Sequence, residues 1–481
     1  MKIFSDNNPR RWAPFAVFFL YLVVVFFLGG GSRPDIAFLE VLRPVSALFL
    51  GYGLWRLRRD QVRAYRELFW VLGAASVLTA LHLVPLPPGL WHALPGRELA
   101  AQVDRAVGAN DQWRPLSLVP FTTWNALFAL LVPITALVLV VQLDRDQRAK
   151  LLLVLLGLGF LSGLWGLIQL AGASDGPLYL YQVTNNGAAV GLFANRNHQA
   201  LLLASLVPML AVFASYGVKT VEQRGLRGWL AAAGILFLVP LLLVTGSRTG
   251  LVLGILGLAS VFLVYKRPEI ERAPRRKGGE SYGKYVFGMI GVALMVLLTV
   301  VMARANVFDR LAVGDSVDDQ RFQIAGPILD MGWKYFPFGS GIGTFVDVFR
   351  IGEPNTLLDT SYFNHAHNDF LEIWMTGGIP AVLLLFAVFV VGARAAWAAF
   401  MTKRVRDDDL LLQRLSVILF IMMLIASATD YPLRTPIIEC VAIVAAAWLT
   451  PSQRLTAEVS PRVQNNDGSP LGLSLGSGKI D

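Results

Sequence analysis

Apolar residues occur in long runs along the chain, and short clusters of charged residues separate the runs. Many of the runs approach the roughly 20 apolar residues that an α-helix needs to cross a bilayer. The pattern therefore predicts about twelve transmembrane helices. Their approximate spans are residues 14–31, 36–55, 67–85, 121–142, 149–171, 197–216, 228–245, 247–265, 285–303, 378–400, 410–428 and 432–450.

The composition supports the same class of protein. Apolar residues make up 55% of the 481 residues and charged residues 16%, with a mean hydropathy of +0.56. A water-soluble globular domain carries about 25% charged residues. We therefore predict an all-α polytopic membrane protein.

Charge asymmetry predicts how the bundle is oriented, because Lys and Arg in short loops stay on the cytoplasmic side of a membrane. Basic clusters lie at the N-terminus and in the loops at 56–66 and 266–277, so these segments are predicted to be cytoplasmic. With twelve spans, both termini are then cytoplasmic. The long loop at 304–377, where Asp and Glu outnumber Lys and Arg, is predicted to be periplasmic and to contain short helices. These cytoplasmic clusters account for the net charge of +9, and no nucleic-acid binding is predicted.

The chain therefore divides into four predicted parts. Residues 1–303 hold nine transmembrane helices, 304–377 the periplasmic catalytic loop, 378–450 three further helices, and 451–481 a disordered cytoplasmic tail. The first apolar run is predicted to be an uncleaved helix rather than a signal peptide. Cys440 is the only cysteine, so the sequence predicts neither an internal disulfide nor a cysteine-based metal site.

Two of the five histidines, His365 and His367, lie beside Asp369 where the chain returns from the long loop to the membrane. A histidine at a membrane surface can exchange a proton near neutral pH. The spacing of these three residues also suits metal ligands, but no other His or Cys cluster completes a site, so no metal is predicted. His82 and His92 flank a proline-rich loop and are predicted to face solvent.

Arg196, Arg248 and Arg321 lie at helix ends or in the loop on the same predicted periplasmic side. The positive-inside rule disfavours arginines on the periplasmic side, so an arginine at each of these positions indicates a specific role. A guanidinium binds phosphate through two parallel hydrogen bonds, and lipid-linked pyrophosphates present their charge at this depth. We therefore predict that the three arginines bind a pyrophosphate, with membrane anchoring as the alternative. His198 is predicted to cap its helix rather than to act in catalysis.

Other polar features fall on the same side. The segment 430–434 precedes the last span, and 321–336 has the apolar spacing of a helix lying on the outer membrane surface. Gly339, Gly341 and Gly343 resemble a dinucleotide-binding pattern, but no strand and helix surround them. They predict instead a tight turn that lets the backbone approach a partner.

Four groups of residues, in this order, resemble the superfamily of O-antigen ligases and O-antigen polymerases. They are the helix start at 195–198, the turn at 246–250, Arg321 with Trp333 and the glycines of 339–343, and the segment 367–372 with 377–380. The resemblance covers about residues 190–385. The first five spans are similar to the superfamily only in hydropathy.

The resemblance implies a metal-independent, inverting glycosyltransferase that crosses the bacterial inner membrane many times, with its active site facing the periplasm. Its donor is expected to be a glycan on undecaprenyl pyrophosphate, held by Arg196, Arg248 and Arg321. His367 is the expected general base for the acceptor hydroxyl, and His365 is the alternative. The expected supporting residues are Asn195, Asn197, His198, Asn368, Asp369 and Glu372, of which Asp369 or Glu372 would orient the imidazole. No cofactor is expected.

The acceptor stays open at this point. Polymerisation of O-antigen or exopolysaccharide repeats is the first expectation, and the alternatives are ligation to lipid A core and transfer to protein hydroxyls. The expected partners are the lipid-linked donor, a lipid-linked glycan or lipid A core as acceptor, membrane lipids and a chain-length regulator. A transporter or flippase is the alternative from a different class, although transporters place their polar groups near the bilayer midplane.

Overall fold

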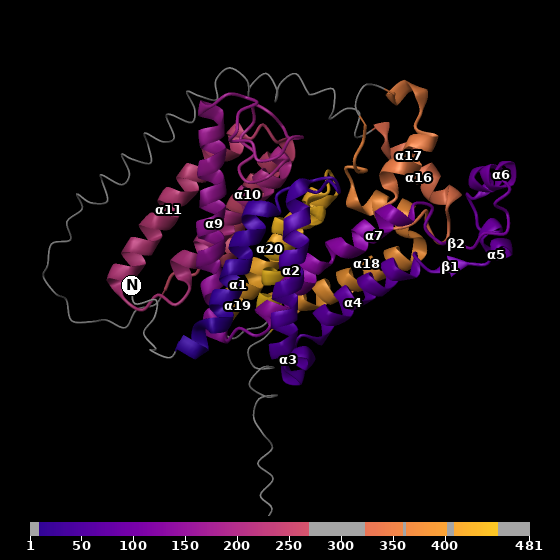
Figure 1. Cartoon of the computed structure of the whole chain (residues 1–481). Helices are drawn as coiled ribbons and strands as arrows, with labels where there is room; N and C mark the ends of the chain where they lie inside the picture. Colours follow the sequence, from indigo (N-terminus) through magenta and orange to yellow (C-terminus); the bar gives the residue numbers. More distant parts are fainter. Residues whose placement is uncertain (1–8, 269–322, 359–361, 402–407, 451–481) are drawn as a thin grey trace, which may run out of the picture.

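The computed structural model describes residues 9–268, 323–358, 362–401 and 408–450 (Figure 1). Most of these residues are helical. The predicted span at 285–303, the predicted tail at 451–481 and the candidate Arg321 lie outside the described residues.

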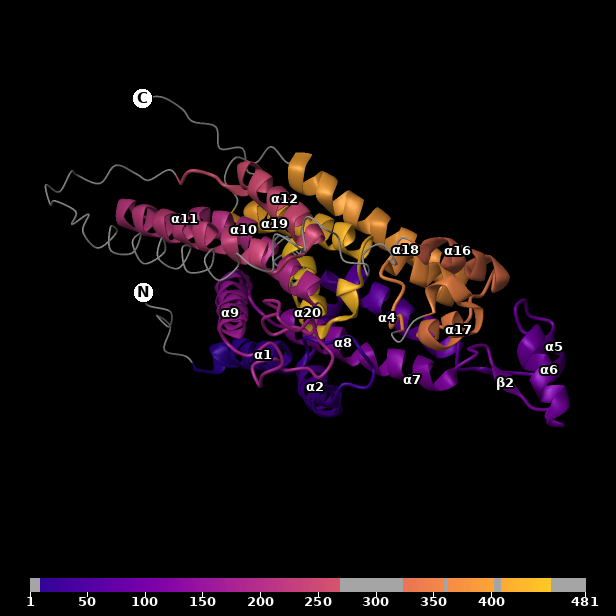
Figure 2. The same ribbon diagram turned by 90° about the horizontal axis from the view of Figure 1, so that it is seen from above.

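The long helices form the body of the molecule, and the short elements α5, α6, α16, α17, β1 and β2 lie at one of its sides (Figures 1 and 2). The long helical segments are α1 (Pro9–Leu28), α2 (Ala37–Arg56), α4 (Arg66–Leu81), α7 (Pro120–Ala129) continued by α8 (Leu131–Val140), α9 (Arg145–Ala171), α10 (Arg196–Ser215), α11 (Val221–Val244), α12 (Arg248–Val264), α18 (Asp369–Met401), α19 (Asp408–Ser427) and α20 (Pro436–Leu449). The short helices are α3 (Arg59–Ala64), α5 (Pro88–His92), α6 (Glu98–Ala106), α16 (Ala325–Lys334), α17 (Phe345–Gly352), η1 (Asn355–Leu357) and η2 (Pro432–Arg434). Strands β1 (Pro85–Leu86) and β2 (Arg114–Pro115) pair antiparallel, with Pro85 opposite Pro115.

Eight of the described helical segments are long and apolar enough to cross a membrane. They are α1 from Arg10, α2, α7 together with α8, α9, α10, α11, α18 and α19, while α12 and α20 are apolar but shorter. The predicted class, an all-α membrane protein, is confirmed. Each predicted span within the described residues overlaps one of the long helices, and the number and direction of the crossings remain predictions. The largest shift is at α18, which begins at Asp369 and bends at Gly378.

Helix α10 occupies the centre of the bundle, where it packs against α9, α11, α12 and α19. In its apolar window 94% of the residues are buried, so protein rather than lipid surrounds it. Gly250 and Gly257 of α12 face Ala200 and Ala204 of α10, and a side chain at Gly257 would meet the Ala204 carbonyl oxygen. Small residues at a membrane helix interface let two backbones approach closely.

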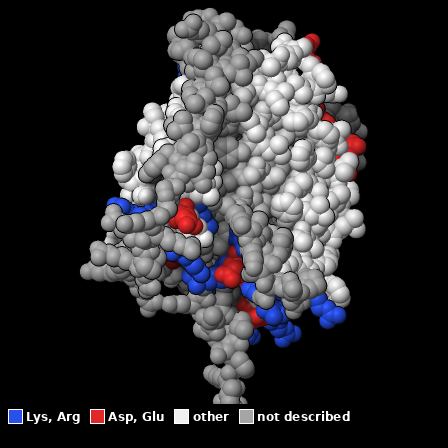
Figure 3. All heavy atoms as spheres, turned by 90° about the vertical axis from the view of Figure 1, so that its left-hand side faces the viewer, with Lys and Arg blue, Asp and Glu red and all other residues white. Residues whose placement is uncertain are grey.

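The helix directions define two ends of the bundle. We call the end where α10, α12, α18 and α20 begin the site end, because the polar segments predicted from the sequence meet there. The opposite end is basic: it carries Arg10, Arg11, Arg56, Arg58, Arg59, Arg63, Arg145, Lys219, Arg224, Lys266 and Arg267. Figure 3 shows charged side chains gathered mainly toward that end, below a broad uncharged surface.

The residues after Gln323 build a small core of their own at the site end. Ile328 of α16, Phe345 and Phe349 of α17, and Met375 of α18 are all buried in it. The predicted surface helix at 321–336 is observed over its described part as α16. This core packs the long loop onto the first turns of α18, directly before the bend.

The glycines at 339–343 form a turn that approaches other parts of the same chain. All three have positive φ, and Gly341 at 120° lies in a region that a residue with a side chain rarely adopts. Gly341 donates to the Thr376 carbonyl (2.9 Å), and Leu118 donates to the Ser340 carbonyl (2.9 Å). The turn therefore joins the start of α7 to the bend of α18.

The same turn corrects the prediction for His82. Its side chain is 1% exposed, and its Nδ1 accepts a hydrogen bond from the Ile342 amide at 3.0 Å. The prediction that His82 faces solvent is wrong, because the glycine turn covers the end of α4. His92 is only partly exposed and lies 3.8 Å from Asp104.

Replacing Gly341 with alanine is expected to destabilise the protein by about 1–3 kcal/mol, because the new side chain adds backbone strain and overlaps Ser117. Thermal unfolding of the purified protein in detergent measures the effect. Gly73→Ala in α4 is the matched control, since a Cβ there meets nothing within 4 Å. Equal unfolding temperatures for the Gly341 variant and the parent would contradict this account of the turn.

Candidate functional site

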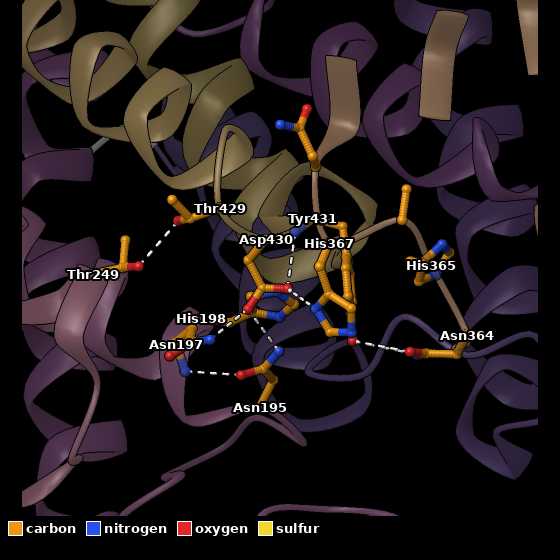
Figure 4. A network of polar contacts seen from close by, with 12 residues as sticks. Asn195, Asn197, His198, Thr249, Asn364, His365, His367, Thr429, Asp430 and Tyr431 are labelled. Carbon is orange, nitrogen blue, oxygen red and sulfur yellow. Dashed lines mark hydrogen bonds and ion pairs between the residues drawn. The ribbon is translucent and has the colours of Figure 1, made fainter. Parts of the chain in front are cut away.

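Four polar segments that are distant in sequence meet at the site end (Figure 4). They are 195–198 at the start of α10, 245–250 before and in the first turn of α12, 364–369 before α18, and 429–434 between α19 and α20. Three of these segments contain the first residues of a helix. Asn195 caps α10 and Ser247 caps α12. At the start of α18, the Asn368 side chain accepts hydrogen bonds from the amides of Phe370 and Leu371. The caps orient the neighbouring side chains.

Asp430 lies at the centre of this region. Its Oδ2 accepts hydrogen bonds from the side-chain amides of Asn195 (3.1 Å) and Asn197 (2.6 Å). Its Oδ1 lies 3.3 Å from His367 Nδ1 and 3.9 Å from His198 Nε2. The carboxylate is buried, so these amides and imidazoles replace water around it.

His198 has a different place from the one predicted. The cap of α10 is Asn195, which accepts from the Asn197 amide at 2.8 Å, so the prediction that His198 is the cap is wrong. The His198 ring is buried and its Nδ1 lies 2.9 Å from the Thr435 hydroxyl. It thus joins α10 to the segment before α20.

A pocket of about 170 Å³ opens beside Asp430. Its lining residues are Arg196, Asn197, Gly246, Arg248, Thr249, Ala325, His367, Asn368, Leu371, Ala428 and Thr429. The structure therefore brings Arg196, Arg248 and His367, which come from three separate helix starts, to one cavity.

His367 has an unusual backbone. Its φ of 49° is left-handed, and no other residue with a side chain in the described parts of the chain has a positive φ. Such conformations are rare outside glycine and cluster at functional sites. The ring packs on Tyr431, with centroids 5.0 Å apart, and on Phe363. These contacts direct the imidazole toward both Asp430 and the pocket.

His365 belongs to a neighbouring cluster and does not line the pocket. Its Nδ1 lies 3.2 Å from Glu372, which also accepts from the Ala366 amide at 2.9 Å. Arg434 completes the cluster by contacting Glu372 (3.1 Å) and Asp369 (3.0 Å). The carboxylate next to His365 is therefore Glu372, and Asp369 pairs with an arginine.

The carboxylate next to His367 is neither of the two that the sequence suggested. Asp430 takes that position, and the sequence signal for it was the polar segment 430–434, whose acidic residue received no role. Arg434 was missed in the same way. Within the described parts of the chain, no three His, Cys, Asp or Glu side chains are grouped as metal ligands.

The arrangement has two chemical capabilities. Two guanidinium groups at one pocket can hold a polyanion and stabilise charge that develops on it. An imidazole whose Nδ1 faces a carboxylate presents its Nε2 as a proton acceptor.

Residues 232–386 match the model of a family described as O-antigen ligase. The matched region contains Arg248 and His367 and ends within α18. No curated protein matches the chain. The resemblance to the superfamily of O-antigen ligases and polymerases is confirmed, and it supports a glycosyltransferase-type function in the assembly of O-antigen or related polysaccharides.

Proposed function

We propose that this protein of the O-antigen ligase and polymerase superfamily transfers a glycan from undecaprenyl pyrophosphate to a sugar hydroxyl at the periplasmic face of the bacterial inner membrane. The observation that carries the proposal is the pocket shared by Arg196, Arg248 and His367. It combines groups for a pyrophosphate with a base for a hydroxyl at one end of an apolar helix bundle.

Arg196 and Arg248 are proposed to hold the pyrophosphate. When the bond between the anomeric carbon and the pyrophosphate oxygen breaks, negative charge develops on the leaving group. Two preorganised guanidinium groups stabilise this charge, which is a task that a divalent metal performs in other glycosyltransferases. Arg321 remains a proposed third ligand of the pyrophosphate, outside the described residues.

His367 is proposed as the general base and Asp430 as the residue that positions it. In the proposed tautomer His367 carries its proton on Nδ1, which lies 3.3 Å from Asp430 Oδ1, and its Nε2 lone pair is available for the acceptor hydroxyl proton. The acceptor oxygen then bonds to the anomeric carbon, with inversion, as undecaprenyl pyrophosphate leaves. Because His365 pairs with Glu372 away from the pocket, the geometry favours His367 over His365.

The motif at 195–198 takes on a joint role in this proposal. Asn195 and Asn197 hold Asp430, and Arg196 between them lines the pocket. One turn of chain therefore supports both the base and the leaving-group site.

Polymerisation of O-antigen or exopolysaccharide repeats remains our first proposal for the acceptor. Ligation to lipid A core is the second candidate, and the description of the matched family favours it. Both reactions use the same donor chemistry, so the site described above serves either.

The test is a reaction of purified protein with an undecaprenyl-pyrophosphate-linked repeat unit as the only glycan, in EDTA, followed by electrophoresis. A ladder of longer lipid-linked chains supports a metal-independent polymerase. Transfer only when lipid A core is added supports a ligase. No transfer to any acceptor, with movement of the lipid-linked glycan across a vesicle membrane, would replace the proposal with a transporter.

A further inference from the structure

Several arginines at the site end have carboxylate partners that account for their presence. Arg114 donates to Asp104 at 2.7 Å, and Arg434 donates to Asp369 at 3.0 Å. Such pairs let a cation remain where a membrane protein otherwise avoids one.

Arg33 and Arg350 differ, because both lie against one tyrosine. Arg33 is in the loop between α1 and α2, and its guanidinium carbon lies 5.4 Å from the centre of the Tyr362 ring. Arg350 is in the last turn of α17, and its guanidinium carbon lies 4.4 Å from the same point. Tyr362 is 40% exposed, so ligands can reach this group of three residues, which we call the Tyr362 cluster.

The Tyr362 cluster carries an excess of positive charge. Arg33 binds both oxygens of Asp35, at 2.9 and 2.6 Å. These hydrogen bonds hold the pKa of the Asp35 carboxyl below its usual range, so Asp35 neutralises Arg33. Arg350 is exposed and forms no ion pair with any carboxylate of the described residues. Counted over the described residues, the cluster therefore carries one cationic charge that no carboxylate balances, which suits an anionic ligand.

Short contacts connect the Tyr362 cluster to the proposed base. The next residue, Phe363, packs on Phe349 of α17 and on the His367 ring, with ring centroids 5.9 and 6.4 Å apart. Asn364 then shares a hydrogen bond with Tyr431, the residue that supports His367. Tyr362 of the cluster and the proposed base therefore lie on one segment, and Phe363 joins that segment to α17.

The segment that carries Tyr362 leads from the proposed base away from the pocket residue Thr249 (Figure 4). In Figure 4 the chain leads from His367 past His365 to Asn364, away from Thr249 of the pocket. Tyr362 precedes Asn364 on this segment, and we assign the Tyr362 cluster to the acceptor side of His367 on that ground. In an inverting transfer, the acceptor approaches the anomeric carbon opposite the leaving pyrophosphate.

We propose that Arg33, Arg350 and Tyr362 form a subsite for an anionic group, phosphate or carboxylate, of a glycolipid acceptor. This inference rests on the proposed function. A guanidinium binds either anion through two parallel hydrogen bonds, and the tyrosine hydroxyl adds a further donor. Binding of an anionic group next to the acceptor sugar would hold the reacting hydroxyl of that sugar near His367.

Transfer kinetics with the full-length protein test the subsite. For Arg350→Ala we expect the KM for lipid A core or for the lipid-linked acceptor to rise about 10-fold, as for loss of one charge-assisted hydrogen bond, with the donor KM unchanged. Arg350→Lys should recover part of the loss, because it restores charge but not the planar fork. Arg105→Ala, at another exposed arginine of the site end, is the control and should behave like the parent.

A structural role would give a different result. If Arg350 only clamps the segment before His367, kcat falls and the acceptor KM stays constant. That outcome, or an unchanged acceptor KM in both Arg33→Ala and Arg350→Ala, overturns the inference.

A second measurement does not depend on transfer. Phenylglyoxal modification of Arg350, followed by mass spectrometry, is compared in the presence of glucose 1-phosphate, glucuronic acid and glucose. Protection by one of the two acids but not by glucose supports the subsite and distinguishes phosphate from carboxylate. If neither acid protects Arg350 from modification, the proposed subsite is overturned. If the protein shows no glycan transfer, the proposed function fails, while the protection experiment still decides whether the anion subsite exists.

Discussion

His367→Ala is expected to lower the rate of glycan transfer by roughly 100-fold to 10,000-fold, the range that a positioned general base contributes. The variant keeps Arg196 and Arg248, so donor binding should remain. The measurement is the initial rate of undecaprenyl pyrophosphate release by purified protein at saturating donor. Size-exclusion chromatography shows whether the variant stays folded.

The matched control for this prediction is His365→Ala. His365 contacts Glu372 and does not line the pocket, so its loss should affect stability more than the rate constant of transfer. If the His365 variant loses transfer while the His367 variant keeps it, the assignment of the base is wrong.

Asp430→Asn separates positioning from proton transfer. The substitution keeps the shape of the side chain but removes the anion that lies 3.3 Å from His367 Nδ1. We expect a lower transfer rate, and the acid limb of the pH profile should move to lower pH, because the imidazolium loses its anionic partner. A fall in rate at every pH with no displacement of that limb would show that Asp430 acts only through packing.

Arg248→Ala is expected to lower the transfer rate 100-fold to 1,000-fold, similar to the loss of one preorganised hydrogen-bond donor to a developing anion. The Arg248 side chain lines the same pocket as His367, and its place in the first turn of α12 is fixed by the Ser247 cap. Arg248→Lys should recover little, because an ammonium cannot bind two phosphate oxygens in the planar geometry of arginine. Transfer rates with purified variants measure both effects.

The control for Arg248 is Arg224→Ala, at a partly exposed arginine of the basic end. Its transfer rate should equal that of the parent. Parent-like transfer by Arg248→Ala, in protein that elutes normally, would remove Arg248 from the proposed pyrophosphate site.

The positions of the long helices were largely predictable from the sequence, because each requires an apolar run of nearly bilayer length. Details that depend on packing were not. The start of α18 at Asp369 was missed, since Asp369 and Glu372 interrupt the apolar run there and the core around Met375 holds these turns. The burial of His82 was missed because Ile342, which covers it, is distant in sequence.

The candidate site was predictable in its membership but not in its pairings. Arg196, Arg248 and His367 lie at helix ends that helix order places on one side, so their convergence follows from topology. Which carboxylate meets which histidine does not, because Asp430 comes from a turn between two later helices. Only tertiary packing joins that turn to the start of α10, through Asn195 and Asn197.

The order of these parts along the chain has a consequence for biosynthesis. Arg196, Arg248 and His367 are all translated before Asp430, which lies between α19 and α20, the last two described helices. Under the proposed mechanism, the nascent protein carries its pyrophosphate ligands in the bilayer well before the partner of its base is inserted. A prematurely terminated chain would then be unable to consume the lipid-linked donor, and activity would begin only when the final helix pair has joined the bundle.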